Sequence, residues 1–347
     1  MTGITDHSTS TRADRRDAAA ALSRGRRSFP ARLLALALAA LAPACAAGER
    51  LEVPTTDPYD FAQMAPGAPA TTRVHARLIL PPGDTVPRGA AILSHGAAGP
   101  GSRQTRMAER LAADGIAALV MDHFGPRGVG STTRDQLRVT EQTMIADLHA
   151  ARAVLAERLA IDPGRIGLIG WSKGATAVTL ASVARLSAYA APGAASLPFA
   201  IAFYPFCGFD LSGEALGAPL LLLLAGQDDW TPAAPCRAQA EAWQAAGQPV
   251  DWRLYEGALH GFDSTAAPRR IDSPVTVRDT SPACTLTVDA RGRTVTLDDA
   301  HALGSPEGRR RFLAACGVRG VSFGGDAAAR ADADRAVRAF IDTRLAN

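Results

Sequence analysis

This sequence has little net charge, no long apolar run and no closely spaced cysteines. Its 347 residues carry a formal net charge of +3, and much of the positive charge falls in the first 32 residues. The rest is near neutral, which argues against a basic surface for nucleic acid. The apolar run at residues 33–42 is too short to span a bilayer as a helix. No spacing of cysteine and histidine typical of a zinc site occurs.

The N-terminal residues have the order of a secretory signal, with arginines first, then the apolar run, then small residues at 44–47. Residues 26–29, Arg-Arg-Ser-Phe, resemble a twin-arginine export signal, and a general secretory signal is the alternative. Cys45 is a candidate lipoprotein cysteine, but the residues before it match a lipobox poorly. Ordinary cleavage after Ala44 or Ala47 is therefore favoured.

Removal of a signal peptide at residues 1–47 would leave a mature chain, residues 48–347, that is periplasmic or secreted and has no stable membrane span. An even number of cysteines remains in it, which in an exported chain indicates disulfides. Buried free thiols are the alternative, and the sequence does not choose among the three possible pairings. The four cysteines are Cys207, Cys236, Cys284 and Cys316.

The composition of the whole chain, with 47% apolar and 20% charged residues, is that of an ordinary globular enzyme. Short apolar segments alternate with longer segments of helical period, which predicts a mostly parallel sheet with helices on both faces. Functional residues of such sheets lie at the carboxyl ends of strands. The predicted strands are 74–80, 90–93, 116–121, 165–170, 199–204, 220–224 and 251–255. The predicted helices are 103–113, 140–159, one from near Ser172, 233–246 and 327–345.

Residues 264–326 break this alternation. Segments 285–288 and 294–297 alternate around a turn at 289–292, which predicts a small hairpin. We interpret the region as an insertion in a domain formed by residues 48–347. A disulfide between Cys284 and Cys316 is one way in which it could be held.

Residues 170–174, Gly-Trp-Ser-Lys-Gly, match the pattern G-x-S-x-G between a predicted strand and a predicted helix. The glycines allow a tight turn that exposes the hydroxyl of Ser172 at the sheet edge. The N-terminus of the helix favours the negative charge that develops there. Ser172 is therefore the candidate nucleophile, with a glycine-rich structural turn as the alternative.

A serine nucleophile needs a base, and in this pattern the chain order is serine, acid, histidine. His260 and His301 both follow Ser172 with an acid between. His260 lies just after the predicted strand 251–255, where a general base belongs, whereas His301 lies in the insertion. We expect His260 to be the base.

The acid is expected after the preceding strand, 220–224, which leads into Asp228 and Asp229. Either carboxylate could hold the imidazole tautomer and stabilise its charged form. The other aspartate would then cap the helix that follows Pro232. Spacing alone leaves both assignments open.

Two backbone amides are expected to bind the oxyanion. One belongs to Lys173, directly after the nucleophile. The other comes from the loop at residues 95–99, where the amide of Gly96 or Ala97 is the candidate. A turn that only needs glycine is the alternative for this loop.

Five motifs in order resemble the dienelactone hydrolase family, and the resemblance covers roughly residues 70–263 and the final helix. It implies an α/β-hydrolase fold. In that family the acid lies four residues before a proline, as Asp228 does before Pro232, so the resemblance selects Asp228. The motifs are Ser94-His95-Gly96, Asp122-His123-Phe124-Gly125-Pro126-Arg127-Gly128, Gly170-Trp171-Ser172-Lys173-Gly174, Asp228-Asp229-Trp230-Thr231-Pro232 and His260-Gly261-Phe262.

Some positions depart from the founding members of the family. Those proteins have cysteine in place of Ser172, a glutamate near the oxyanion loop and an arginine shortly after the histidine. These differences argue against dienelactone itself as the substrate. Arg127, Trp171 and Trp230 are candidates for substrate binding. Arg127 could bind a substrate carboxylate or form a structural ion pair within its own loop.

Together these residues predict an exported serine hydrolase that cleaves a small-molecule ester or lactone through an acyl-enzyme. The chemistry needs no cofactor and no metal. One alternative is a serine peptidase related to the prolyl oligopeptidases, against which the missing propeller domain argues. Another is an envelope binding protein without activity, against which the complete set of three groups argues.

Overall fold

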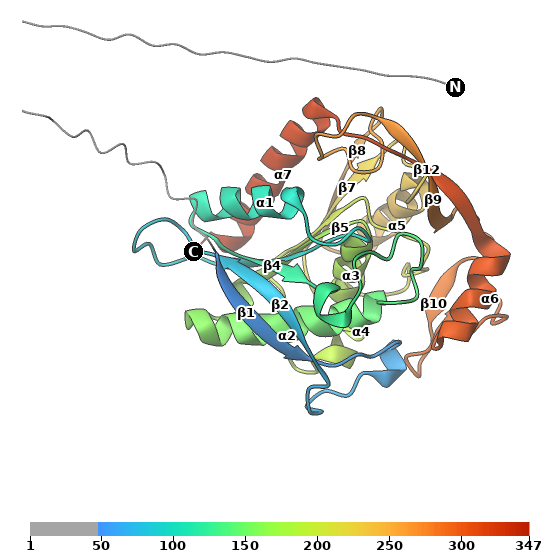
Figure 1. The fold of residues 1–347 in the computed structure, drawn as a ribbon, viewed down its shortest axis with the longest axis horizontal. Coiled ribbons are helices and arrows are strands. Elements are labelled where there is room, and N and C mark those ends of the chain that lie inside the picture. Colours follow the sequence, from blue (N-terminus) through green and yellow to red (C-terminus); the bar gives the residue numbers. More distant parts are fainter. Residues whose placement is uncertain (1–47, 347) are drawn as a thin grey trace, which may run out of the picture. The chain divides into compact units, whose positions relative to one another are not determined.

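An eight-stranded sheet organises residues 48–346, the part of the chain that this computed structural model describes (Figure 1). The predicted signal peptide, with Cys45, lies outside the described residues. The first three strands in the sheet pair antiparallel and all later neighbours pair parallel. In spatial order the strands are β1 (Glu49–Thr55), β2 (Thr72–Ile79), β4 (Ala117–Asp122), β3 (Ala90–Ser94), β5 (Ile166–Trp171), β6 (Ala200–Phe203), β7 (Leu220–Ala225) and β8 (Val250–Tyr255).

The central strands are apolar along their whole length because both faces of the sheet are covered. Every residue of β3, β5, β6 and β7 is buried, as expected for parallel strands between two layers of helices. The predicted strands are present with ends shifted by one or two residues. Strand β1 was not predicted, because it lies at the sheet edge and its charged residues Glu49, Arg50 and Glu52 interrupt the apolar pattern.

Helices cover both faces of the sheet and pack on separate clusters of buried apolar residues. α1 (Ser102–Ala113) and α7 (Ala327–Leu345) lie on one face (Figure 1). The other face carries α2 (Glu141–Leu159), α3 (Lys173–Ser182), α4 (Ala184–Ala190) and α5 (Ala233–Ala245). Single 3₁₀ turns occur at η1 (Phe61–Gln63), η2 (Gly125–Arg127) and η3 (Pro163–Arg165). This is the predicted α/β architecture. Within residues 48–346, no helix is long and apolar enough to cross a membrane.

Residues 264–326 form two small sheets and one helix between β8 and α7. The predicted hairpin is confirmed as β10 (Leu286–Val288) paired antiparallel with β11 (Thr294–Thr296). A second antiparallel pair, β9 (Arg269–Val277) with β12 (Gly317–Phe323), was not predicted. Neither was α6 (Pro306–Cys316), which begins at the cap Ser305.

Two disulfides join the four cysteines of the described chain. The Cys207–Cys236 bond links the segment after β6 to α5. The Cys284–Cys316 bond links the segment just before β10 to the last residue of α6. The prediction of disulfides is confirmed. The second bond closes a loop inside residues 264–326, so it holds α6 against the hairpin.

Candidate active site

Ser172 lies in a strained turn between β5 and α3. Its backbone has φ 52° and ψ −120°, a conformation that L-residues rarely adopt. The turn requires two glycines, because at each of them another segment of backbone approaches too closely to leave room for a side chain. A Cβ on Gly170 would overlap the carbonyl of Gly174, and one on Gly174 would overlap the carbonyls of Ser94 and His95. The G-x-S-x-G pattern therefore reflects packing of β5 against α3 and the end of β3.

A continuous chain of hydrogen bonds joins Ser172, His260 and Asp228. His260 Nε2 lies 3.0 Å from Ser172 Oγ, and His260 Nδ1 lies 2.7 Å from Asp228 Oδ2. Both His260 and Asp228 are buried, whereas Ser172 is partly exposed. The three residues follow β5, β7 and β8 at the carboxyl edge of the sheet, where β7 and β8 are neighbours and β6 lies between β5 and β7.

The two adjacent aspartates have different environments. Asp228 Oδ1 accepts the amides of Trp230 and Thr231, each at 2.8 Å, and Oδ2 faces His260 and the Thr231 hydroxyl. Asp229 instead accepts the amide and hydroxyl of Ser322 in β12. The expectation that Asp229 caps the following helix was wrong, because α5 begins at Ala233 with Pro232 as its N-cap and has no side-chain cap. Asp229 attaches the loop to the insertion.

The loop after β3 brings two predicted oxyanion residues to Ser172. A Cβ on Gly96 would lie 3.2 Å from Ser172 Cβ, and Ala97 and Lys173 line the same cavity as Ser172. Among the described residues, no hydrogen-bond acceptor is found for the amides of Ala97 and Lys173. Both amides are therefore available to an oxyanion.

His95 orients the peptide between Gly96 and Ala97. Its Nε2 accepts the amide of His123 at 3.1 Å, so the ring proton is on Nδ1, which donates to the Gly96 carbonyl at 2.8 Å. Gly99 N also donates to this carbonyl. In a trans peptide the N–H of Ala97 points opposite to the Gly96 carbonyl, and therefore away from the His95 ring. Burial, with a smaller contribution from His123, lowers the pKa of His95 to about 3, so the ring stays neutral.

A buried hydrogen-bond network that the sequence did not reveal connects the end of β5, just before Ser172, to the loop that carries His260. Asp263 accepts Trp171 Nε1 at 2.8 Å and the hydroxyl of Tyr204 at 2.5 Å. Arg103 donates to the same hydroxyl at 3.1 Å. Trp171 precedes the nucleophile and Asp263 follows His260 by three residues, so the network fixes the two segments relative to one another. In the sequence, the only indication of this network is that Trp171 lies within the motif of Ser172 and Asp263 directly follows the motif of His260.

The three residues predicted to bind substrate lie in different places. Trp230 lines the cavity beside the His260 ring, with ring centroids 4.7 Å apart. Trp171 is buried against Phe203 and is not among the described lining residues.

Arg127 is also not among the described lining residues. It donates to both oxygens of buried Asp147, at 2.7 and 2.9 Å, and to Asp57 and the His123 carbonyl. Arg127 therefore forms its ion pairs with Asp147 of α2 and with Asp57, not within its own loop as the alternative stated.

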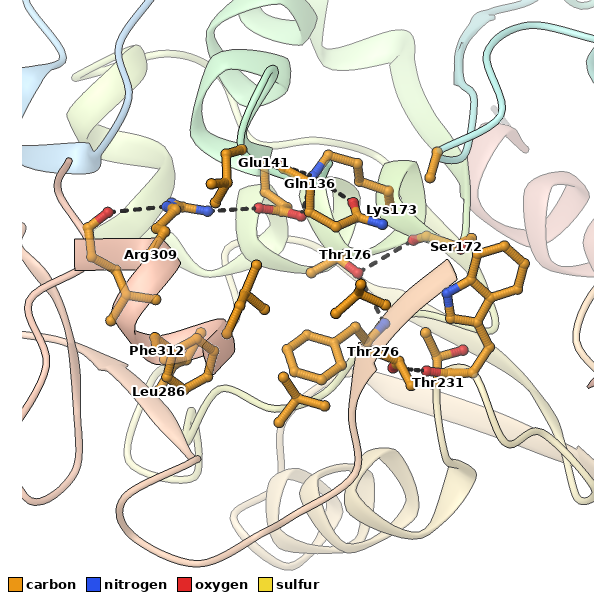
Figure 2. A pocket seen from close by; sticks show the side chains of 18 of the residues that line it. Gln136, Glu141, Ser172, Lys173, Thr176, Thr231, Thr276, Leu286, Arg309 and Phe312 are labelled. Atoms are coloured by element: carbon orange, nitrogen blue, oxygen red, sulfur yellow. Dashed lines mark hydrogen bonds and ion pairs between the residues drawn. The ribbon is translucent and has the colours of Figure 1, made fainter. Parts of the chain in front are cut away.

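A cavity of about 110 Å³ opens from Ser172. Figure 2 shows Ser172 at one end, with Leu286 and Phe312 towards the other. The part of the chain before residue 264 contributes Ala97, Gln136, Leu137, Glu141, Ser172, Lys173, Thr176, Phe206, Phe209, Trp230 and Thr231. Residues 264–326 contribute Val275, Thr276, Val277, Leu286, Leu303, Arg309, Phe312 and Leu313. The insertion therefore forms much of the wall, which the sequence did not predict.

One side of the cavity carries a row of paired charges (Figure 2). Lys173 Nζ lies 2.8 Å from one oxygen of Glu141, and Arg309 lies 3.4 Å from the other. Burial alone would raise the pKa of Glu141, but the two cations outweigh it and lower this pKa. Burial lowers the pKa of Lys173, partly offset by Glu141. The Lys173 ammonium also contacts Gln136 twice, so each of its three N–H groups has an acceptor.

The sheet order and the position of Ser172 in a strand-to-helix turn define an α/β-hydrolase fold. The sequence model of the Dienelactone hydrolase family matches residues 74–281, more than half of the chain. The chain belongs to this family, as its motifs predicted. Among proteins of curated function, the sequence comparison finds no match.

Several solved structures are similar to this chain. A proposed dienelactone hydrolase of Klebsiella pneumoniae subsp. pneumoniae is 17% identical, with 77% of this chain and 98% of that chain covered and a TM-score of 0.46. Butyrate-bound esterase 2 of Thermogutta terrifontis is 19% identical, with 62% and 86% covered and a TM-score of 0.45. A dienelactone hydrolase-like promiscuous phosphotriesterase from metagenomic libraries is 18% identical, with 63% and 85% covered and a TM-score of 0.46.

Proposed function

We propose that this protein is a serine hydrolase that cleaves a carboxylic ester or lactone through an acyl-enzyme. The observation that carries the proposal is the hydrogen-bonded chain from Asp228 through His260 to Ser172, which ends on a cavity. Membership of a family of hydrolases supports it. No cofactor or metal takes part in the proposed reaction.

In the first step His260 Nε2 takes the proton from Ser172 Oγ as this oxygen attacks the substrate carbonyl. Asp228 accepts the hydrogen bond from Nδ1–H, remains ionised and stabilises the imidazolium that forms. The imidazolium then gives its proton to the leaving alcohol oxygen, and the acyl group stays on Ser172. Water, deprotonated by His260, then attacks the acyl carbonyl. The bond between the acyl carbon and Ser172 Oγ breaks, the imidazolium returns its proton to Ser172 Oγ, and the acid leaves.

The negative oxygen of the tetrahedral intermediate is bound by the amides of Lys173 and Ala97. We choose Ala97 over Gly96 because the Gly96 carbonyl is held by His95, which leaves the Ala97 amide turned away from that ring. Both donors are preorganised backbone groups, so they need no rearrangement as charge develops.

A fluorophosphonate probe tests the proposal directly, because it labels activated serine nucleophiles. We expect one covalent adduct, assigned by mass spectrometry to Ser172, together with hydrolysis of at least one member of a panel of 4-nitrophenyl esters and lactones. Heat-denatured protein serves as the control and should not be labelled. Absence of both labelling and hydrolysis would contradict the proposal and favour a binding protein.

The mature hydrolase, residues 48–347, is proposed to be exported by a signal peptide at residues 1–47. The two disulfides support this, because such bonds persist in oxidising compartments. A reporter fused to residues 1–50 should cross the inner membrane. Replacing Arg26 and Arg27 by lysine should block export if the twin-arginine route is used. A mature protein that still begins at Met1 or Thr2 would contradict the proposal.

A further inference from the structure

We propose that residues 264–326 form the acyl pocket of this enzyme, and that the preferred acyl group is uncharged, apolar and up to about the size of a phenyl ring. The proposal rests on the hydrolase function proposed above. It assigns a substrate class and specificity-determining residues, chief among them Phe312.

The position of His260 indicates which half of the ester enters the cavity. The histidine must protonate the leaving oxygen, so the alcohol half lies on its side of Ser172. Ala97 and Lys173, the proposed oxyanion donors, line the cavity, and Trp230 and Thr231, which contact His260, line it beside Ser172. From Ser172 the cavity continues past Lys173 to Leu286 and Phe312 (Figure 2), and we assign this part, away from His260, to the acyl half.

The size of the cavity limits the acyl group. Its volume is about 110 Å³, somewhat less than the ~150 Å³ of an engineered apolar cavity that holds benzene. Leu286 and Phe312 lie at the end away from Ser172 (Figure 2), and Phe209 and Leu303 also line the cavity. These side chains offer apolar contact and no hydrogen-bonding group.

The charged side of the cavity holds two cations and one carboxylate, and all three groups have partners within the protein. Glu141 uses one oxygen for Lys173 and the other for Arg309. Arg309 also donates to Gln142 at 2.8 Å and to the Leu303 carbonyl at 3.0 Å. An acyl group with its own carboxylate would have to displace Glu141 from these partners, and an unpaired buried charge is costly. An uncharged acyl group leaves the row intact.

The test compares two series of esters at neutral pH. In the first, 4-nitrophenol is constant and the acyl group runs from acetate through butyrate, hexanoate and benzoate to decanoate, with hemisuccinate as the charged member. We expect kcat/KM to rise about fourfold per methylene until the cavity is full, then to fall, and hemisuccinate to be slower than butyrate. In the second, butyrate is constant and the alcohol varies.

Variants at Phe312 should move the acyl optimum. Phe312→Ala and the milder Phe312→Leu should shift it to longer chains, and Phe312→Trp should shift it to acetate, while the alcohol series keeps its order. Val318→Ala is the matched control, because Val318 belongs to the same insertion and is exposed. It should leave both series unchanged.

The outcomes separate the two proposals. An enzyme that hydrolyses esters but whose folded Phe312 variants alter only the alcohol series, or neither series, would overturn the acyl pocket alone. A hemisuccinate preferred over butyrate would overturn the uncharged substrate class. A wild-type protein that neither hydrolyses any ester nor reacts with the fluorophosphonate would overturn both the function and this inference.

Discussion

The hydrolase core and the insertion at residues 264–326 hold side chains at the same cavity by different means. In the core, Ser172 and Asp228 follow the buried parallel strands β5 and β7, and each ring nitrogen of His260 has its own partner. The insertion reaches the core through contacts such as Thr276 with the Trp230 carbonyl and Ser322 with Asp229. Its β10, β11, α6 and β12 lie beyond the family match, which ends at residue 281.

Under the two proposals made above, reactivity and selectivity belong to separate segments. Reaction in the core depends on single atoms at distances of 2.7 to 3.0 Å. Selectivity in the insertion depends on apolar volume, which several side chains supply together. Core substitutions should therefore change rates on all substrates, and insertion substitutions should change mainly the ratio between substrates.

The largest effect is expected at the nucleophile. Ser172→Ala should lower kcat by about 10⁶ and abolish fluorophosphonate labelling, because no other group can form the acyl-enzyme. Thermal unfolding should stay close to that of the wild type, since alanine meets the same backbone strain as serine. Ser182→Ala, in the same helix, is the control and should keep its labelling. Labelling that persists in Ser172→Ala would contradict the assignment.

The two aspartates give the next largest contrast, within one loop. Asp228→Asn should lower kcat by roughly 10³ to 10⁴, because the amide favours the wrong imidazole tautomer. Asp229→Asn should leave kcat nearly unchanged and reduce the free energy of unfolding by about 1 kcal/mol, since it weakens bonds to Ser322. Steady-state kinetics on one activated ester and urea unfolding would check both. A greater rate loss in Asp229→Asn would reverse the roles.

His95 should act as a positioning residue in the core. His95→Ala should lower kcat about 10- to 100-fold with a smaller change in KM, because the Gly96–Ala97 peptide loses one of two donors that orient it. His95→Asn should restore part of kcat, since its amide nitrogen can replace Nδ1 as the donor. Equal losses in both variants, with KM rising in parallel, would indicate a merely structural role.

The smallest effect on rate is expected from the disulfide of the insertion. Replacing Cys284 and Cys316 by serine should reduce the free energy of unfolding by on the order of 3 kcal/mol, because the bond closes a long loop. Hydrolysis of 4-nitrophenyl acetate should change less than about threefold, because no reacting group lies in the insertion, while discrimination between butyrate and decanoate should weaken. Loss of acetate hydrolysis in a folded variant would show that the two regions are not separable.

The sequence alone predicted the alternation of strands and helices, the turn that carries Ser172, the position of His260 and the hairpin in the insertion. These features depend on residues close together in the chain, where apolar period and glycine spacing are informative. Helix α7 was predicted with the ends that the structure has, residues 327–345. Export by residues 1–47 remains a prediction, because those residues lie outside the described structure.

Only the tertiary structure decided which groups meet across the chain. Spacing left Asp228 and Asp229 equivalent, and the family pattern chose between them; the contacts with His260 and Ser322 show how they differ. Trp171 and Asp263 are 92 residues apart and share a hydrogen bond. Phe312 reaches the cavity of Ser172 because the insertion folds back over the sheet edge. Local periodicity contains no information on such contacts, since they depend on how whole elements pack together.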